Sequence, residues 1–83
     1  MQSRYNVRKT HGEAKVKVRY RVKELAESRG LDRAKLARQA DVTYETIHSL
    51  WRNPYRDVSM STLLKIARAL GVGVTDLYEE VED

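Results

Sequence analysis

The sequence predicts an all-α fold, a compact bundle of five short helices preceded by a basic arm and a possible short β-strand. Three observations indicate it. Apolar residues recur at helical spacing through most of the chain after Arg21, capping residues and glycines separate these stretches, and 83 residues can enclose only one core. The chain has no cysteine and two histidines without a near ligand partner, so we expect no disulfide, metal or other cofactor.

Composition divides the chain into four segments. Residues 1–14 are polar, aperiodic and basic, and are expected to form a flexible arm. In residues 15–21 basic and apolar residues alternate, which is the period of a strand. Residues 22–78 hold the helical pattern, and residues 79–83 are an acidic tail.

The strand needs a partner, because one strand cannot satisfy its own backbone hydrogen-bonding groups. No other segment alternates as clearly, so a copy from a second chain is the expected partner, with Val16, Val18 and Tyr20 as the dimer strand. In the alternative interpretation the first helix begins early, the alternation is chance, and no strand forms.

The first two helices are short. The first follows the strand and ends at Gly30, a residue type typical of helix C-termini. Asp32 can cap the second helix, whose apolar stripe consists of Leu36, Ala37 and Ala40.

A third helix starts after a brief break at Asp41 and Val42. Thr43 is a good N-cap for it, and Ile47 and Leu50 form its inner face.

The Asn-Pro pair in residues 52–57 predicts a loop. Either Ser59 or Ser61 then caps a strongly periodic fourth helix, which Gly71 ends. Residues 74–78 are expected to form a short fifth helix that closes the core.

Two short helices joined by a turn of three or four residues have the geometry of a helix-turn-helix. Ala37 lies where the helices cross, Val42 fills the corner of the turn, and Ile47 docks the second helix on the core. Other small helical bundles also place Ala and Leu at such positions, so spacing alone leaves DNA binding and a purely structural role open.

Four segments resemble the lambda-repressor-like or Cro-like helix-turn-helix proteins, also called the XRE family: VKELAESRGL, DRAKLARQADV, TYETIHSL and STLLKIARALGVGVTDLY. The resemblance runs from Val22 to Tyr78, and the last segment is its most specific part. It implies a sequence-specific binder of double-stranded DNA, a transcriptional regulator and repressor that acts as a homodimer and inserts its third helix into the major groove.

The chain departs from the family pattern in three places. Asp41 stands where a glycine is usual, and Asp is among the few residue types that tolerate the positive φ expected there. Asp32 and Arg33 replace the usual Thr-Gln pair, so Asp32 takes the cap and Arg33 can reach a phosphate. Trp51 lies in an atypical segment, where it either covers the core beside the fourth helix or contacts DNA or a second copy.

The resemblance makes the third helix the recognition helix. The residues expected at base edges are Thr43, Tyr44, Glu45 and Ser49. Glu45 either accepts from a cytosine amino group or only stabilises the helix dipole. No Arg, Asn or Gln opens this helix, so we expect modest direct specificity. The candidates for phosphate contacts are Arg33, Thr46, His48, Arg52, Asn53, Tyr55 and Arg56.

Charge is divided unevenly along the chain. Residues 1–38 hold twelve Lys and Arg against four acids, whereas residues 39–83 hold four against eight. The basic half favours an anionic partner, and Arg4, Arg8 and Lys9 of the arm can follow the adjacent minor groove. One small module buries little DNA surface, so we expect a homodimer on half-sites about 10 base pairs apart or a multiple of that.

Other classes of function are less favoured. His11 and His48 lack a nucleophile or carboxylate partner, and no glycine-rich phosphate loop occurs, so we expect no enzyme. An antitoxin or protein-interaction adaptor on the same bundle is the alternative. RNA binding is less favoured because the chain shows no aromatic stacking surface on a sheet, which readers of single-stranded RNA generally use. Neither a membrane span nor an export signal occurs, so a cytoplasmic protein is expected.

Overall fold

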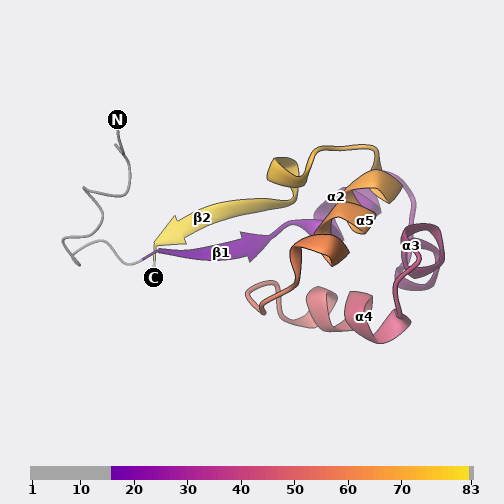
Figure 1. The fold of residues 1–83 in the computed structure, drawn as a ribbon, viewed down its shortest axis with the longest axis horizontal. Coiled ribbons are helices and arrows are strands. Elements are labelled where there is room, and N and C mark those ends of the chain that lie inside the picture. Colours follow the sequence, from indigo (N-terminus) through magenta and orange to yellow (C-terminus); the bar gives the residue numbers. More distant parts are fainter. Residues whose placement is uncertain (1–15, 83) are drawn as a thin grey trace.

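The computed structural model describes residues 16–82. In this part of the chain, helices predominate and a two-stranded sheet joins the two ends (Figure 1). The elements in chain order are β1 (Val16–Tyr20), α2 (Val22–Ser28), α3 (Arg33–Ala40), α4 (Tyr44–Arg52), α5 (Met60–Leu70), the 3₁₀ helix η1 (Val74–Leu77) and β2 (Tyr78–Glu82). The helices gather at one end of the molecule, and the β1–β2 ribbon projects from them.

Side-chain caps begin three of the helices at the predicted residues. Asp32 Oδ1 accepts from the Lys35 backbone N–H at 2.8 Å, and the hydroxyls of Thr43 and Ser59 each accept from the N–H three residues on at 3.2 Å. Of the two serines considered for the fourth helix, Ser59 is therefore the cap. Gly71 ends that helix in the left-handed conformation, with φ of 73°.

The core is apolar throughout, since no polar or charged residue among the described ones is buried. Each helix contributes to it, and η1 adds Leu77, which is 0% exposed. The buried residues are Val22, Ala26, Leu36, Ala37, Ala40, Ile47, Leu50, Leu63, Ile66, Ala67, Leu70 and Leu77. Burial of one large aliphatic side chain contributes about 1.5–3 kcal/mol, so this set supplies the main driving force for folding.

The structure does not show the predicted fifth α-helix, and it places most of the acidic tail in a strand. The described residues form four α-helices, and the segment expected to be a fifth makes only one 3₁₀ turn, Val74–Leu77. Tyr78, expected in that helix, begins β2, and residues 79–82 of the expected tail belong to the same strand. The run of acids hid the strand, because the sequence of Tyr78–Glu82 shows no clear apolar alternation.

The strand predicted at residues 15–21 is confirmed as β1, but its expected partner was wrong. β1 pairs in antiparallel fashion with β2 of the same chain, with Tyr20 opposite Tyr78 and Val16 opposite Glu82. The physical reason is proximity and charge: η1 delivers an acidic segment beside a basic one. A second chain is therefore not needed to satisfy the backbone hydrogen-bonding groups on the edge of β1 that faces β2.

Charge pairing holds the base of this ribbon. The Arg19 guanidinium lies 3.0 Å from the carboxylate of Glu79, its cross-strand neighbour, and also donates to Glu24 at the start of α2. Partial burial raises the pKa of Glu24, but the hydrogen bond from Arg19 and the nearby positive charges outweigh it and lower the pKa below its ordinary value. Both pairs are exposed to solvent, so each contributes at most about 1 kcal/mol.

Candidate nucleic-acid interface

α3 and α4 meet through a turn of three residues, Asp41 to Thr43. Asp41 adopts the left-handed conformation, with φ of 60° and ψ of 46°. Its N–H and that of Val42 return to the carbonyls of Arg38 and Ala37, at 3.3 and 3.1 Å. The positive φ predicted at this position is confirmed, and the Asp in place of the usual Gly preserves the turn.

Substitutions at Asp41 are expected to follow the cost of its left-handed backbone. Asp41→Gly should leave the free energy of unfolding within about 1 kcal/mol of the wild type, because Gly adopts this φ without strain. Asp41→Val should lower it by about 1–2 kcal/mol, because a β-branched residue is strained there. Urea denaturation of both variants checks this, and equal stabilities would contradict it.

α4 is seated on the core by one face and exposed by the other. Ile47 and Leu50 are buried at 0% and 2% exposure, as predicted, whereas Tyr44, the first residue of the helix, is 46% exposed. Trp51 is half-buried and packs against the core, where it lines a hollow with Leu31. Trp51 thus covers the core as expected, but its neighbours in that hollow belong to α2, α3 and the segment between them and not to α5, the predicted fourth helix.

The two threonines at the start of α4 make hydrogen bonds within the first turn of the helix. The Thr43 hydroxyl caps the helix and also lies 2.9 Å from the Thr46 hydroxyl. Thr46 is half-buried, and so is Ser49 in the next turn. Of the four residues predicted at base edges, the structure thus leaves Tyr44 and Glu45 most open to a partner.

Arg33 and His48 come together from different helices. Arg33 Nη1, in the first turn of α3, lies 3.2 Å from His48 Nδ1 on α4. The Tyr44 ring stacks on the imidazole, with ring centroids 5.7 Å apart and an interplanar angle of 13°. Three residues predicted separately as DNA contacts therefore form one connected cluster.

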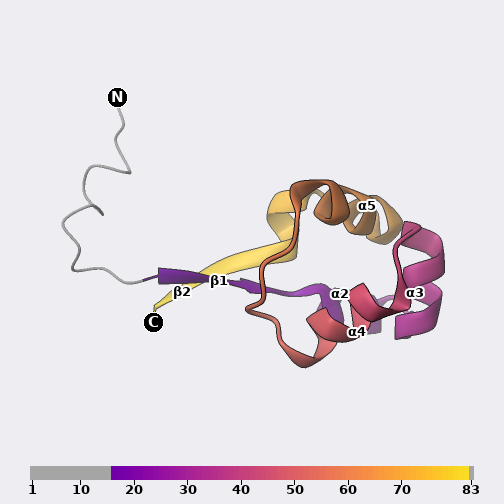
Figure 2. The ribbon, with the colours of Figure 1, turned by 60° about the horizontal axis from the view of Figure 1, so that its bottom comes forward.

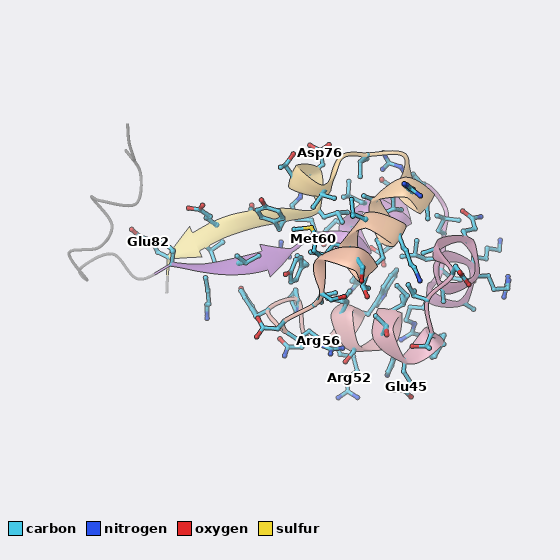
Figure 3. The ribbon with its side chains drawn as sticks, in the orientation of Figure 1. Glu45, Arg52, Arg56, Met60, Asp76 and Glu82 are labelled. Atoms are coloured by element: carbon cyan, nitrogen blue, oxygen red, sulfur yellow. The ribbon has the colours of Figure 1, made fainter. Side chains whose placement is uncertain are left out.

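The loop after α4 extends the exposed side of that helix. Arg52 and Arg56 project on the same side of the molecule as Glu45 (Figure 3). Asn53 organises the loop, since its side-chain oxygen accepts from the Tyr55 N–H at 3.1 Å. The remaining predicted phosphate contact, Tyr55, is 44% exposed.

β1 anchors this loop. The Tyr20 N–H donates to the Pro54 carbonyl at 2.7 Å, and Lys17 Nζ lies 4.6 Å from the centre of the Tyr55 ring. Sequence patterns did not predict these contacts, because they join segments more than thirty positions apart. Another missed contact is that of Lys65, whose Nζ reaches the Asp41 carbonyl from α5 at 3.4 Å.

Contacts between the arm and DNA fall outside the described residues, because Arg4, Arg8 and Lys9 precede residue 16. Within residues 16–82, no group of three or more His, Asp or Glu could hold a metal ion. No helix in that range is long and apolar enough to cross a membrane.

Comparison with known proteins points in the same direction as the geometry. A family model described as the Cro/C1-type HTH DNA-binding domain matches residues 21–83. Among solved structures, the transcriptional regulator VanUg is similar, with a TM-score of 0.67 and 24% sequence identity over 83% of this chain and 91% of that chain. At this identity the likeness concerns the fold. The comparison with curated proteins found no match.

Proposed function

This chain belongs to the family of Cro/C1-type helix-turn-helix DNA-binding domains, and from that premise we propose that it is a transcriptional repressor that binds a specific duplex site as a homodimer. In this proposal α4 enters the major groove and Tyr44 and Glu45 meet base edges. The chain acts by binding, without catalysing a reaction. The similar fold of a transcriptional regulator supports the regulatory part of the proposal.

One observation carries the proposal: α4 is fixed by its buried face while its leading residues stay open. Ile47 and Leu50 lie in the core, and Tyr44 and Glu45 are exposed. A helix that reads base edges needs both properties, because the groove admits only an exposed helix and discrimination between bases needs fixed side chains.

Selection of bound sequences from a random DNA pool tests the proposal. We expect enrichment of a two-fold symmetric site with half-sites about 10 base pairs apart or a multiple of that. An unenriched pool, combined with no binding to any duplex at low salt, would overturn it. Enrichment of an asymmetric single site would retain DNA recognition and remove the homodimer.

Phosphate contacts from the loop after α4 predict a change in salt dependence. Log affinity falls as log salt concentration rises, and each cation that neutralises a phosphate adds about one to the steepness of that fall. The double variant Arg52→Gln, Arg56→Gln should therefore make the fall less steep by about two. Titrations of a labelled duplex at several salt concentrations measure the slope. The control is Arg68→Gln on α5, which lies on the other side of the helical bundle from α4 (Figure 2). An equal slope for double variant and wild type would contradict these contacts.

The homodimer needs an interface other than pairing of β1 edges. In antiparallel pairing of two β1 strands, Lys17 and Arg19 would face basic residues of the copy, which is destabilising. Large apolar side chains are exposed on β1 and on α5, at Val16, Val18, Met60 and Leu64. Contact through such side chains supports association of two copies.

The variant Leu64→Glu is therefore expected to weaken the dimer by at least about tenfold, because it places a charge in an apolar contact. Sedimentation of the wild type and the variant, with and without DNA, measures the association. A wild type that remains monomeric at high micromolar concentration in both conditions would count against the dimer.

A further inference from the structure

The side chains around His48 determine how this histidine can contact a partner. They belong to Arg33 and Tyr44. We propose that His48 donates a hydrogen bond from Nε2 to a DNA phosphate, and that Arg33 is the positioning residue that keeps His48 in the donating form. The inference rests on the proposed function, because it names one contact made by the same surface.

The first step concerns the proton on the imidazole. A guanidinium group carries only donors, so the contact of 3.2 Å between Arg33 Nη1 and His48 Nδ1 requires a lone pair on Nδ1. A neutral imidazole with an acceptor at Nδ1 carries its proton on Nε2. The Arg33 contact therefore selects one tautomer and leaves an N–H donor at Nε2.

The second step concerns the orientation of the ring. The Tyr44 ring stacks on the imidazole nearly in parallel, at 13° and a centroid distance of 5.7 Å. The ring is thus held by a contact at its edge from α3 and a contact on its face from α4. Because His48 is only half-buried, a partner can approach the ring from solvent.

The third step concerns the acceptor. The Arg33 charge lies beside the imidazole and favours an anionic acceptor over a neutral base edge. His48 also lies one turn beyond Tyr44 and is less exposed, which suits the flank of the groove better than its floor. A phosphate oxygen satisfies both conditions, and such contacts position a protein on the duplex regardless of sequence.

Two substitutions at one position separate the two nitrogens. In His48→Gln the side-chain amide nitrogen reaches roughly the place of Nε2, whereas in His48→Asn it reaches only that of Nδ1. We expect His48→Gln to bind duplex DNA within about twofold of the wild type and His48→Asn about tenfold more weakly, which is the cost of one hydrogen bond to a charged group. The weakening should be equal on the selected site and on an unrelated duplex.

Equal affinities for the Gln and Asn variants would overturn the Nε2 donor. A loss confined to the selected site would overturn the phosphate and indicate a base contact. If the wild type bound no duplex at all, the proposed function would be overturned. A measurement on the free protein tests the role of Arg33 independently of that result.

That measurement is the ¹⁵N spectrum of the imidazoles in the free, full-length chain at neutral to mildly alkaline pH. We expect Nδ1 of His48 to be unprotonated and hydrogen-bonded, and Arg33→Met to move its resonance toward that of a free acceptor nitrogen. A His11→Asn variant assigns the signals, since the chain has two histidines. A proton on Nδ1, or no change in Arg33→Met, would overturn the role of Arg33.

Discussion

Ile47→Ala is expected to lower the free energy of unfolding by about 2–5 kcal/mol, the usual cost of removing three buried carbons and leaving a cavity. Ile47 is 0% exposed and is the central contact of α4 with the core. Small domains are stable by only about 5–15 kcal/mol in total. The variant should therefore be partly unfolded at moderate temperature, and its folded fraction should hold α4 less firmly.

Urea denaturation followed by the fluorescence of Trp51 measures this effect. Trp51 is the single tryptophan of the chain and belongs to α4, so its emission reports directly on that helix. Ile47→Val is the matched control and should cost only about 0.5–1.5 kcal/mol. If Ile47→Ala were as stable as Ile47→Val, α4 would not depend on this contact.

The double variant Tyr44→Ala, Glu45→Ala is expected to remove most of the preference for the selected DNA site. Base contacts discriminate by about 1–3 kcal/mol each, so the ratio of specific to nonspecific affinity should fall at least tenfold. Stability should change by no more than about 1 kcal/mol, because both side chains are exposed and only the stack on His48 and an acid in the first helical turn are lost.

Single variants divide this effect between the two residues. Tyr44→Phe keeps the stack and the apolar contact, so it serves as the control. If Glu45→Ala alone leaves the site preference intact and lowers stability by about 0.3–1 kcal/mol, Glu45 acts on the helix dipole and not on a base. If the double variant still selects the site, the leading end of α4 is not the reading surface. An adaptor role would be favoured if the wild type captured a protein partner and the double variant captured it equally well.

Local chemistry made much of the fold predictable. The caps Asp32, Thr43 and Ser59 and the stop at Gly71 act on backbone groups within a few residues, so a sequence shows both sides of each interaction. The positive φ at Asp41 was instead implied by the family resemblance, because glycine is usual at that position of the turn. The buried faces of α3, α4 and α5 followed from the helical period.

Tertiary structure decided the features that join distant segments. The pairing of β1 with β2 depends on where η1 places an acidic segment, and the Arg33–His48 contact depends on how α3 crosses α4. The sequence of a strand shows its own alternation but not which segment pairs with it, because the free energy of pairing depends on both strands and on the fold that brings their edges together. The sequence by itself determined the helix-turn-helix and its exposed leading end, whereas only the folded chain decided which strand completes the sheet and which nitrogen of His48 is left to donate.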